Sequence, residues 1–382
     1  MSPPAYDLSP LLAIAVVGML LALAPLVWFW SRRRHAAPAA RLRALALLTL
    51  FLCFDLVLLG GFTRLSDSGL GCPDWPGCYG HASPIGAHDP IASAQAAVPT
   101  GAVTHGKAWI EMAHRYSATA IGVLVVVLAA LAIVESRRRR IAGSAGWAIA
   151  CVVWIVLQGA FGALTVTMKL YPAIVTMHLL GGLALLALLA VQAESYEPRG
   201  LVLPASLRIG LAVVAALVVV QIALGGWVST NYAVLACRDF PTCQGSWWPD
   251  MNAAEAFAWR RPLGISESGG YLPFAALTAI HMAHRLGALV VVPALVILAW
   301  RLSARGGAPA RPWAHALLGL AAWQLSSGLA NVLFDWPLAS AVAHTAGSAA
   351  LVVVLTILLV RSARRGATAD PTRQAAGTPL AS

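Results

Sequence analysis

Residues 60–80, GGFTRLSDSGLGCPDWPGCYG, decide the architecture of this chain, because the same pattern returns at residues 225–245, GGWVSTNYAVLACRDFPTCQG. The two stretches lie 165 residues apart and share a Gly-Gly pair, a C-x5-C pair and a closing glycine. Each repeat contains several hydrophobic segments, so the pattern indicates a duplicated membrane unit rather than a solenoid.

Two histidine motifs repeat at nearly the same spacing. A His-Arg pair lies in EMAHRYSA at 111–118 and again in HMAHRLGA at 281–288. A single histidine lies in TMHLLGG at 176–182 and again in VAHTAGS at 342–348. The histidines of these motifs are His114, His178, His284 and His344.

The composition is that of an integral membrane protein. Hydrophobic residues make up 59% of the chain and charged residues 11%, and the mean hydropathy is +0.76. A soluble domain carries about 25% charged residues. The hydrophobic runs reach the roughly 20 residues that a helix needs to cross a bilayer.

The net charge of +11 is distributed unevenly between the two sides of the membrane. Alternate loops, which include Arg32–Arg34 and Arg137–Arg140, hold 18 of the 26 Lys and Arg residues. This asymmetry follows the positive-inside rule and excludes a nucleic-acid partner, so we expect these loops in the cytoplasm. Because the first span precedes Arg32 and no Arg-rich presequence precedes that span, we expect a bacterial plasma membrane, a periplasmic N-terminus and a cytoplasmic C-terminus.

The pattern predicts an all-α polytopic membrane protein with one extra N-terminal helix and two sets of four helices. Because four is even, both sets begin at the same face, as in parallel repeats related by a pseudo-two-fold axis along the membrane normal. The predicted spans are 11–30, 44–62, 112–134, 147–166, 173–192, 209–228, 278–300, 313–333 and 338–360.

The chain divides accordingly into four parts. These are the extra helix with a basic linker (1–40), the N-terminal half (41–200), the C-terminal half (201–365) and a disordered tail (366–382). Each half contains one long outer connection, 63–111 or 229–277, and connections of that length are usually functional or disordered.

Each of the four histidines lies within about the first two turns of a helix that enters from outside, so all four are expected at a similar depth. The residue three positions on is always small, and it lies on the same helical face. Such a face would let a porphyrin approach, so the pattern favours two bis-His haem irons, one in each half. A polar contact between helices and a zinc site are the alternatives. The four small residues are Ser117, Gly181, Gly287 and Gly347.

The residues around the His-Arg pairs separate the two halves. Arg115 and Arg285 can reach the interface and pair with haem propionates, or can be plain interfacial arginines. Three residues before the pair stands Glu111 in the first half and His281 in the second. A carboxylate one turn from an iron ligand suggests function, and a solvated acid at a helix start is the alternative. Asp55 has no counterpart and no assigned role.

The C-x5-C pairs lie in the two long outer loops, where an oxidising compartment permits disulfides. A structural disulfide and redox chemistry close to a haem are both open for Cys72 with Cys78, and a structural disulfide is favoured for Cys237 with Cys243. The remaining cysteines, within hydrophobic spans, are expected to be small buried side chains.

Together these motifs, TRLSDSGLGCPDWPGC, E-x-x-HR, the second His-Arg pair and the single histidines, resemble the haem A synthase family over residues 42–362. That family converts haem O to haem A by oxidising a porphyrin methyl group to a formyl group, through hydroxylation and loss of water. Its core has eight helices, so residues 11–30 are an addition.

The resemblance also implies the site and its partners. The substrate haem O would be held in the N-terminal half and a haem b cofactor in the C-terminal half. Haem O synthase and terminal oxidase assembly factors are the expected partners, with an unidentified electron donor, and a homo-oligomer is left open. The implied roles are haem O binding by His114, His178 and Arg115, haem b binding by His284, His344 and Arg285, catalysis by Glu111, Cys72 and Cys78, and disulfides Cys72–Cys78 and Cys237–Cys243.

Two other functions remain open from the residues alone. A dihaem membrane cytochrome that carries electrons would use both histidine pairs, but it has no need of a carboxylate beside only one haem. A thiol-oxidising membrane protein would use the cysteine pairs and leave the four histidines unexplained.

Overall fold

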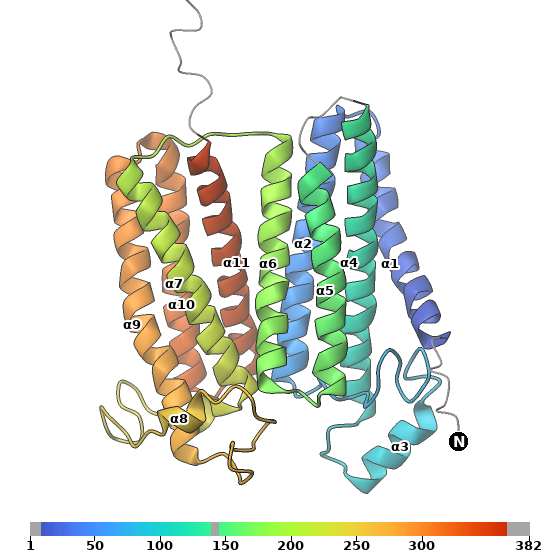
Figure 1. Ribbon diagram of the computed structural model, residues 1–382, viewed down its shortest axis with the longest axis vertical. Helices are drawn as coiled ribbons and strands as arrows, with labels where there is room; N and C mark the ends of the chain where they lie inside the picture. Colours follow the sequence, from blue (N-terminus) through green and yellow to red (C-terminus); the bar gives the residue numbers. More distant parts are fainter. Residues whose placement is uncertain (1–8, 139–144, 365–382) are drawn as a thin grey trace, which may run out of the picture.

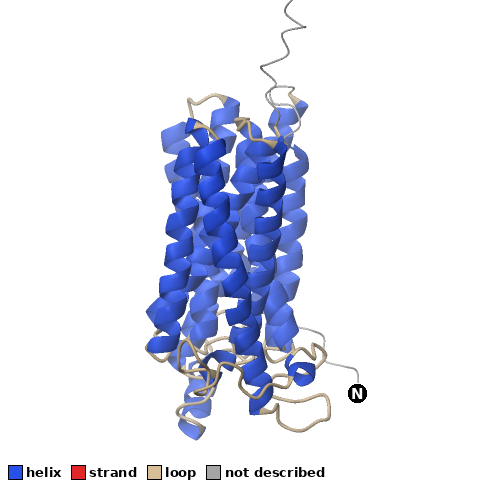
Figure 2. Ribbon diagram, turned by 90° about the vertical axis from the view of Figure 1, so that its left-hand side faces the viewer, coloured by secondary structure: helices blue, strands red, loops and turns tan. Residues whose placement is uncertain are grey.

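The computed structural model describes residues 9–138 and 145–364, and this part of the chain is helical without strands (Figures 1 and 2). Within it, nine helices are long and apolar enough to cross a membrane, which confirms the predicted number. They are α1 (Ser9–Arg33), α2 (Pro38–Leu65), α4 (His105–Arg137), α5 (Ala145–Thr167), α6 (Pro172–Tyr196), α7 (Ala205–Thr230), α9 (Phe274–Arg305), α10 (Arg311–Leu333) and α11 (Leu338–Ala363). The predicted disordered tail, 366–382, lies outside the described residues.

The helices run along one bundle, and the long connections gather at one end of it. The short helices α3 (His88–Ala97) and α8 (Ala253–Ala256) lie at the lower end in Figure 1. Helix α1 begins at that end and α11 finishes at the opposite end. Two 3-10 turns, η1 (Ala233–Ala236) and η2 (Ala308–Ala310), complete the described elements.

The helices of each half pack in the same order. In the first half α2 contacts α4 and α6, and α5 contacts the same two helices; in the second half α7 and α10 do the same with α9 and α11. The halves meet where α6 contacts α7 and α11, and where α11 contacts α2. The extra helix α1 packs on α4, with Gly18 so close that a Cβ there would lie 2.5 Å from Thr119 Cγ2.

Equivalent positions of the two repeats contact one another where the halves meet. The Arg64 guanidinium donates to the backbone oxygen of Ser229, which stands 165 residues later, and it stacks on the ring of Tyr232. The Tyr232 hydroxyl donates to Asp67, again 165 residues earlier. Contacts between equivalent residues of two repeats are expected where a two-fold axis passes between them. The axis relating the whole halves remains a prediction.

Helices α4 and α9 begin earlier than the hydrophobic pattern predicts, at 105 rather than 112 and at 274 rather than 278. The extra turns of α4 are polar, so they carry no hydropathy signal. The Thr104 side chain accepts from the Lys107 amide and caps the helix. His114 and His284 therefore lie nearly three turns into their helices, whereas His178 and His344 lie within the first two.

Charged side chains at the end opposite the cysteine loops are paired. Arg361 of α11 binds the carboxylate of Glu194 on α6 through two hydrogen bonds of 2.7 and 2.8 Å, which joins the two halves. Arg41 of α2 binds Glu135 of α4 at 2.9 Å. Both glutamates are buried, and pairing offsets the cost of removing their charge from water.

Candidate functional site

Both C-x5-C loops are closed by disulfides, Cys72–Cys78 and Cys237–Cys243, and all four cysteines are buried. A pair of backbone hydrogen bonds then turns each loop back, between Cys78 and His81 and between Cys243 and Ser246. The two loops thus form the same compact structure, at the end of the bundle where the histidine-bearing helices begin.

An aspartate organises each loop from within. Asp74 and Asp239 each accept two backbone N–H groups through both carboxylate oxygens, at 2.6–3.0 Å. The Thr242 hydroxyl is a further donor, and these bonds hold the pKa of Asp239 at about 2, below its usual value. The N–H groups belong to Tyr79 and Gly80 for Asp74, and to Gln244 and Gly245 for Asp239.

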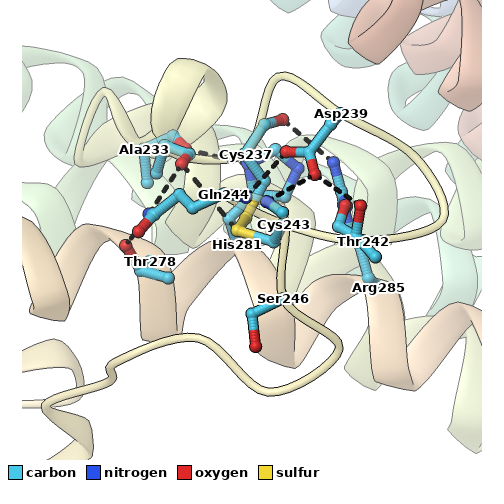
Figure 3. Close-up of a disulfide and its surroundings, with 12 residues drawn as sticks. Ala233, Cys237, Asp239, Thr242, Cys243, Gln244, Ser246, Thr278, His281 and Arg285 are labelled. Carbon is cyan, nitrogen blue, oxygen red and sulfur yellow. Dashed lines mark hydrogen bonds between the residues drawn. A yellow bond between two sulfur atoms is a disulfide. The ribbon is translucent and has the colours of Figure 1, made fainter.

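The arginines of the His-Arg pairs clamp these loops onto the helices. The Arg115 guanidinium donates to the backbone oxygens of Asp74 at 3.1 Å, Pro76 at 3.1 Å and Gly77 at 2.6 Å. Arg285 donates to the corresponding loop through Cys237 and Thr242 (Figure 3). Both guanidiniums are engaged by loop carbonyls, so the predicted contact with haem propionates would have to share them.

Glu111 and His281 distinguish the two clamps. Glu111 is 4% exposed, pairs with Arg115, and accepts the backbone N–H of Cys72 at 2.8 Å. It lies in the second turn of α4 and is buried, so it is not a solvated acid at the helix start. In the second half the His281 ring instead contacts the backbone oxygen of Ala233 at 3.1 Å (Figure 3). Among the described residues of the two loops and their helices, only the first half has a buried ion pair whose two members also bond to the disulfide loop.

Each histidine ring lies against a glycine of a neighbouring helix. A Cβ at Gly60 on α2 would lie 3.0 Å from the His114 ring, and one at Gly225 on α7 would lie 2.9 Å from the His284 ring. The corresponding distances are 3.5 Å from Gly162 of α5 to His178 and 3.3 Å from Gly328 of α10 to His344. Gly60, Gly225 and Gly328 therefore leave room for the imidazole rings, which even an alanine methyl would restrict, whereas at Gly162 an alanine would make an ordinary contact.

The second-half pair has the spacing of two axial ligands. The ring centres of His284 and His344 lie 6.4 Å apart, with their planes at 81°. An imidazole nitrogen binds a transition metal at about 2 Å and lies about 1 Å from its ring centre, so two rings on opposite sides of one metal are about 6 Å apart. His284 and His344 therefore fit a bis-His iron. Within residues 9–138 and 145–364 no three His, Cys, Asp or Glu side chains cluster, which disfavours the zinc alternative.

The interpretation of the glycines three positions after the histidines is wrong. A Cβ at Gly181 would lie 1.9 Å from Gln158, one at Gly287 would lie 2.1 Å from Gln221, and one at Gly347 would meet Trp323 and Gln324. Side chains from the neighbouring helices fill these positions, so the glycines serve helix packing and not a porphyrin face.

Sequence reasoning missed the residues that surround the rings. Gly162 and Gly328 stand 166 residues apart, as do Gln158 and Gln324, so the repeat spacing itself carried a signal for them. Gln221 has no such signal, because its counterpart is Leu56. Which face of each helix meets a histidine depends on helix rotation, which the apolar runs do not define.

This arrangement defines a class: a multi-pass helical membrane protein with a disulfide-closed loop and two histidines in each half. The sequence profile of the COX15-CtaA family, described as cytochrome oxidase assembly protein, matches residues 43–356. This chain belongs to that family. The resemblance noted from the motifs is therefore confirmed.

Named relatives agree with this assignment. The Shewanella oneidensis protein called "Heme A synthase" is 38% identical over 81% of this chain and 93% of its own length. Proteins with the same name from Sphingopyxis alaskensis and Halalkalibacterium halodurans are 32% and 27% identical, over 87% and 75% of this chain and 94% and 86% of theirs. These relatives imply an enzyme of haem A biosynthesis.

Proposed function

We propose that this chain oxidises a porphyrin methyl group of haem O to the formyl group of haem A. The family and the names of the relatives support the overall reaction. The observation that carries the assignment of halves is the buried Glu111–Arg115 pair beside His114, because its counterpart in the second half has no carboxylate. The proposal therefore places substrate oxidation in the N-terminal half.

The ring geometry of the second-half pair fits one haem, and the repeated histidines of the first half support a second. His284 and His344 would hold haem b, and His114 and His178 would hold haem O. Held by His284 and His344, haem b would supply one-electron transfer. The ring spacing of 6.4 Å in the second half supports this division.

The chain's own groups have distinct tasks in this proposal. Arg115 anchors residues 74–77 next to His114 and so restricts water at that end of the helix. Glu111 is oriented by Arg115 and the Cys72 amide, and an ionised carboxylate can accept a proton. A carboxylate held this way can stabilise positive charge or accept a proton without reorganising. Cys72 and Cys78 close the loop that Glu111 and Arg115 contact, and they are the cysteine pair proposed to take part in the reaction.

The proposal includes the cellular setting. The chain would lie in the bacterial plasma membrane with its cysteine loops and N-terminus in the periplasm and its C-terminus in the cytoplasm, as the distribution of Lys and Arg supports. Haem O synthase would supply the substrate and terminal oxidase assembly factors would take the product.

The test uses the full chain in a host that makes haem O but no haem A, with the haems extracted and identified by mass. Glu111→Gln keeps the shape of the side chain and removes its charge, so both haem sites should fill while haem A falls about a hundredfold, equivalent to roughly 2.7 kcal/mol. His281→Gln is the matched control and should leave the yield unchanged.

Three results would contradict the proposal. A wild-type yield from Glu111→Gln, or a loss from His281→Gln alone, would move the chemistry out of the N-terminal half. A wild-type chain that retains two b-type haems and forms no haem A would instead be an electron-carrying cytochrome.

A further inference from the structure

The His344 ring has a partner for the nitrogen that faces away from an iron. Its Nδ1 lies 2.9 Å from the Ser327 hydroxyl, and that hydroxyl donates to the backbone oxygen of Trp323 at 2.7 Å. A hydroxyl has one proton, so Ser327 can only accept from His344. The proton of the imidazole is thereby held on Nδ1, and Nε2 keeps the lone pair that binds a metal.

The His284 ring has a comparable partner in Gln221. The carboxamide nitrogen lies 3.0 Å from His284 Nδ1 and 2.9 Å from the backbone oxygen of the same residue, and the amide oxygen is buried without a partner. When Nε2 binds iron, the imidazole carries its proton on Nδ1. Rotating the Gln221 carboxamide by half a turn places its oxygen beside Nδ1, where it can accept this proton in a hydrogen bond. Both rings of the second-half pair thus have a polar group on their outer nitrogen.

The first half lacks both groups. QGAFG at 158–162 corresponds to QLSSG at 324–328, so Phe161 replaces Ser327, and Leu56 replaces Gln221. His178 Nδ1 is buried, and no group in the described part of the chain bonds to it. The two pairs of ligands therefore differ in their supporting residues, although the histidines themselves are repeated.

We propose that Ser327 and Gln221 are positioning residues that make the second-half pair a permanent haem b site, whereas Leu56 and Phe161 leave the first-half pair suited to a haem that enters and leaves. This rests on the proposed function. An acceptor on Nδ1–H fixes the ring and its tautomer and raises its basicity, and loss of such a partner commonly weakens metal binding about 10- to 100-fold. A haem that is the substrate must leave its site after the reaction, whereas a haem that is a cofactor must stay bound.

The same bond acts on the reduction potential. A more basic imidazole stabilises ferric iron more than ferrous iron, so removing the Ser327 acceptor raises the potential of the C-terminal haem. A tenfold change in the relative binding of the two oxidation states corresponds to about 59 mV for one electron.

The experiment uses the full chain purified with haem b in detergent. Ser327→Ala should transfer haem b to apomyoglobin about 10- to 100-fold faster and raise its midpoint potential by about 59 mV, a tenfold change. Ser326→Ala, at the exposed neighbouring position, should match the wild type, and Ser327→Thr should restore it because the hydroxyl is retained. Equal transfer rates and potentials in Ser327→Ala and Ser326→Ala would overturn the proposal.

A reciprocal change tests the first half. Phe161→Ser supplies a hydroxyl beside His178, and Phe161→Ala opens the same space without one. Release of haem O from the serine variant should be several-fold slower than from the alanine variant, and equal rates would overturn the proposal. Failure of the proposed function looks different, because the wild-type chain would then form no haem A in the host, whatever the transfer rates of the Ser327 and Phe161 variants.

Discussion

Replacing Gly225 by alanine should displace one iron ligand without changing any polar group. The new Cβ would lie 2.9 Å from His284 Cε1 and 3.4 Å from its Nδ1. Ordinary contacts begin at 3.4 Å, so the ring or helix α7 must move by about 0.5 Å. Where the ring takes up this shift, the displacement exceeds the roughly 0.2 Å within which metal–ligand distances fall, so the proposed bond from His284 to iron would be weakened.

The magnitude follows from the packing. Inserting a methyl group into a close-packed contact costs about 1–3 kcal/mol, and if that cost falls on haem binding, affinity drops about 5- to 150-fold. Gly328→Ala makes a milder contact, 3.3 Å from His344 Cε1, and should have a smaller effect. Gly210→Ala lies on the same helix as Gly225 with its nearest contact at 4.0 Å, so it should be neutral or stabilise the helix by up to about 1 kcal/mol.

The assay is the haem b content per protein and the low-spin absorption spectrum of each purified variant during titration with haem b. Gly225→Ala should bind most weakly, Gly328→Ala in between, and Gly210→Ala as the wild type. Gly210→Ala is the control for the effect of any added methyl group on this helix. If Gly225→Ala has the spectrum and haem affinity of the wild type and of Gly210→Ala, the reasoning that glycine makes room for the His284 ring is refuted.

The remaining predictions concern the ligands, the disulfide and the loop clamp. His284→Ala and His344→Ala should each abolish the low-spin haem b spectrum, and an unchanged spectrum in both would contradict the assigned ligands. Cys72 and Cys78 should react with a thiol reagent in the full chain only after reduction, since they form a buried disulfide; labelling before reduction would contradict it. Arg115→Lys should speed proteolysis within residues 72–80 several-fold, because one ammonium group cannot reach three carbonyls and a carboxylate together; an unchanged rate would show that the clamp is dispensable.

The number of spans and the identity of the repeated motifs were predictable because both depend on local composition. A bilayer selects apolar runs of a given length, so all nine spans stand out in the one-dimensional pattern. The disulfide partners share one short loop, and their pairing needs no long-range information. The start of α4 was less predictable, since residues 105–111 include charged and polar side chains and carry little hydropathy signal.

The direction of each side chain was not predictable, and the arginines show why. Arg115 and Arg285 were expected to pair with haem propionates or to be plain interfacial arginines, and the structure shows that both donate to loop carbonyls some 40 residues away in sequence. The glycines after the histidines were expected to form a flat face, but Gln158 and Gln221 fill it. Both depend on how neighbouring helices are rotated and docked, and the sequence pattern of a helix that is apolar all round does not encode its rotation.

The sequence by itself thus determined that this is a duplicated membrane protein, and it identified the cysteine pairs and the four candidate iron ligands. Each of these features is visible in the composition of single segments or in the comparison of two segments. The tertiary structure alone decided that Glu111 is buried against Arg115 and the Cys72 amide, and that Ser327 and Gln221 contact the second-half rings. Those contacts join helices and loops that are distant in sequence. Their energies depend on distances of about 3 Å, which only the packing of the whole bundle sets.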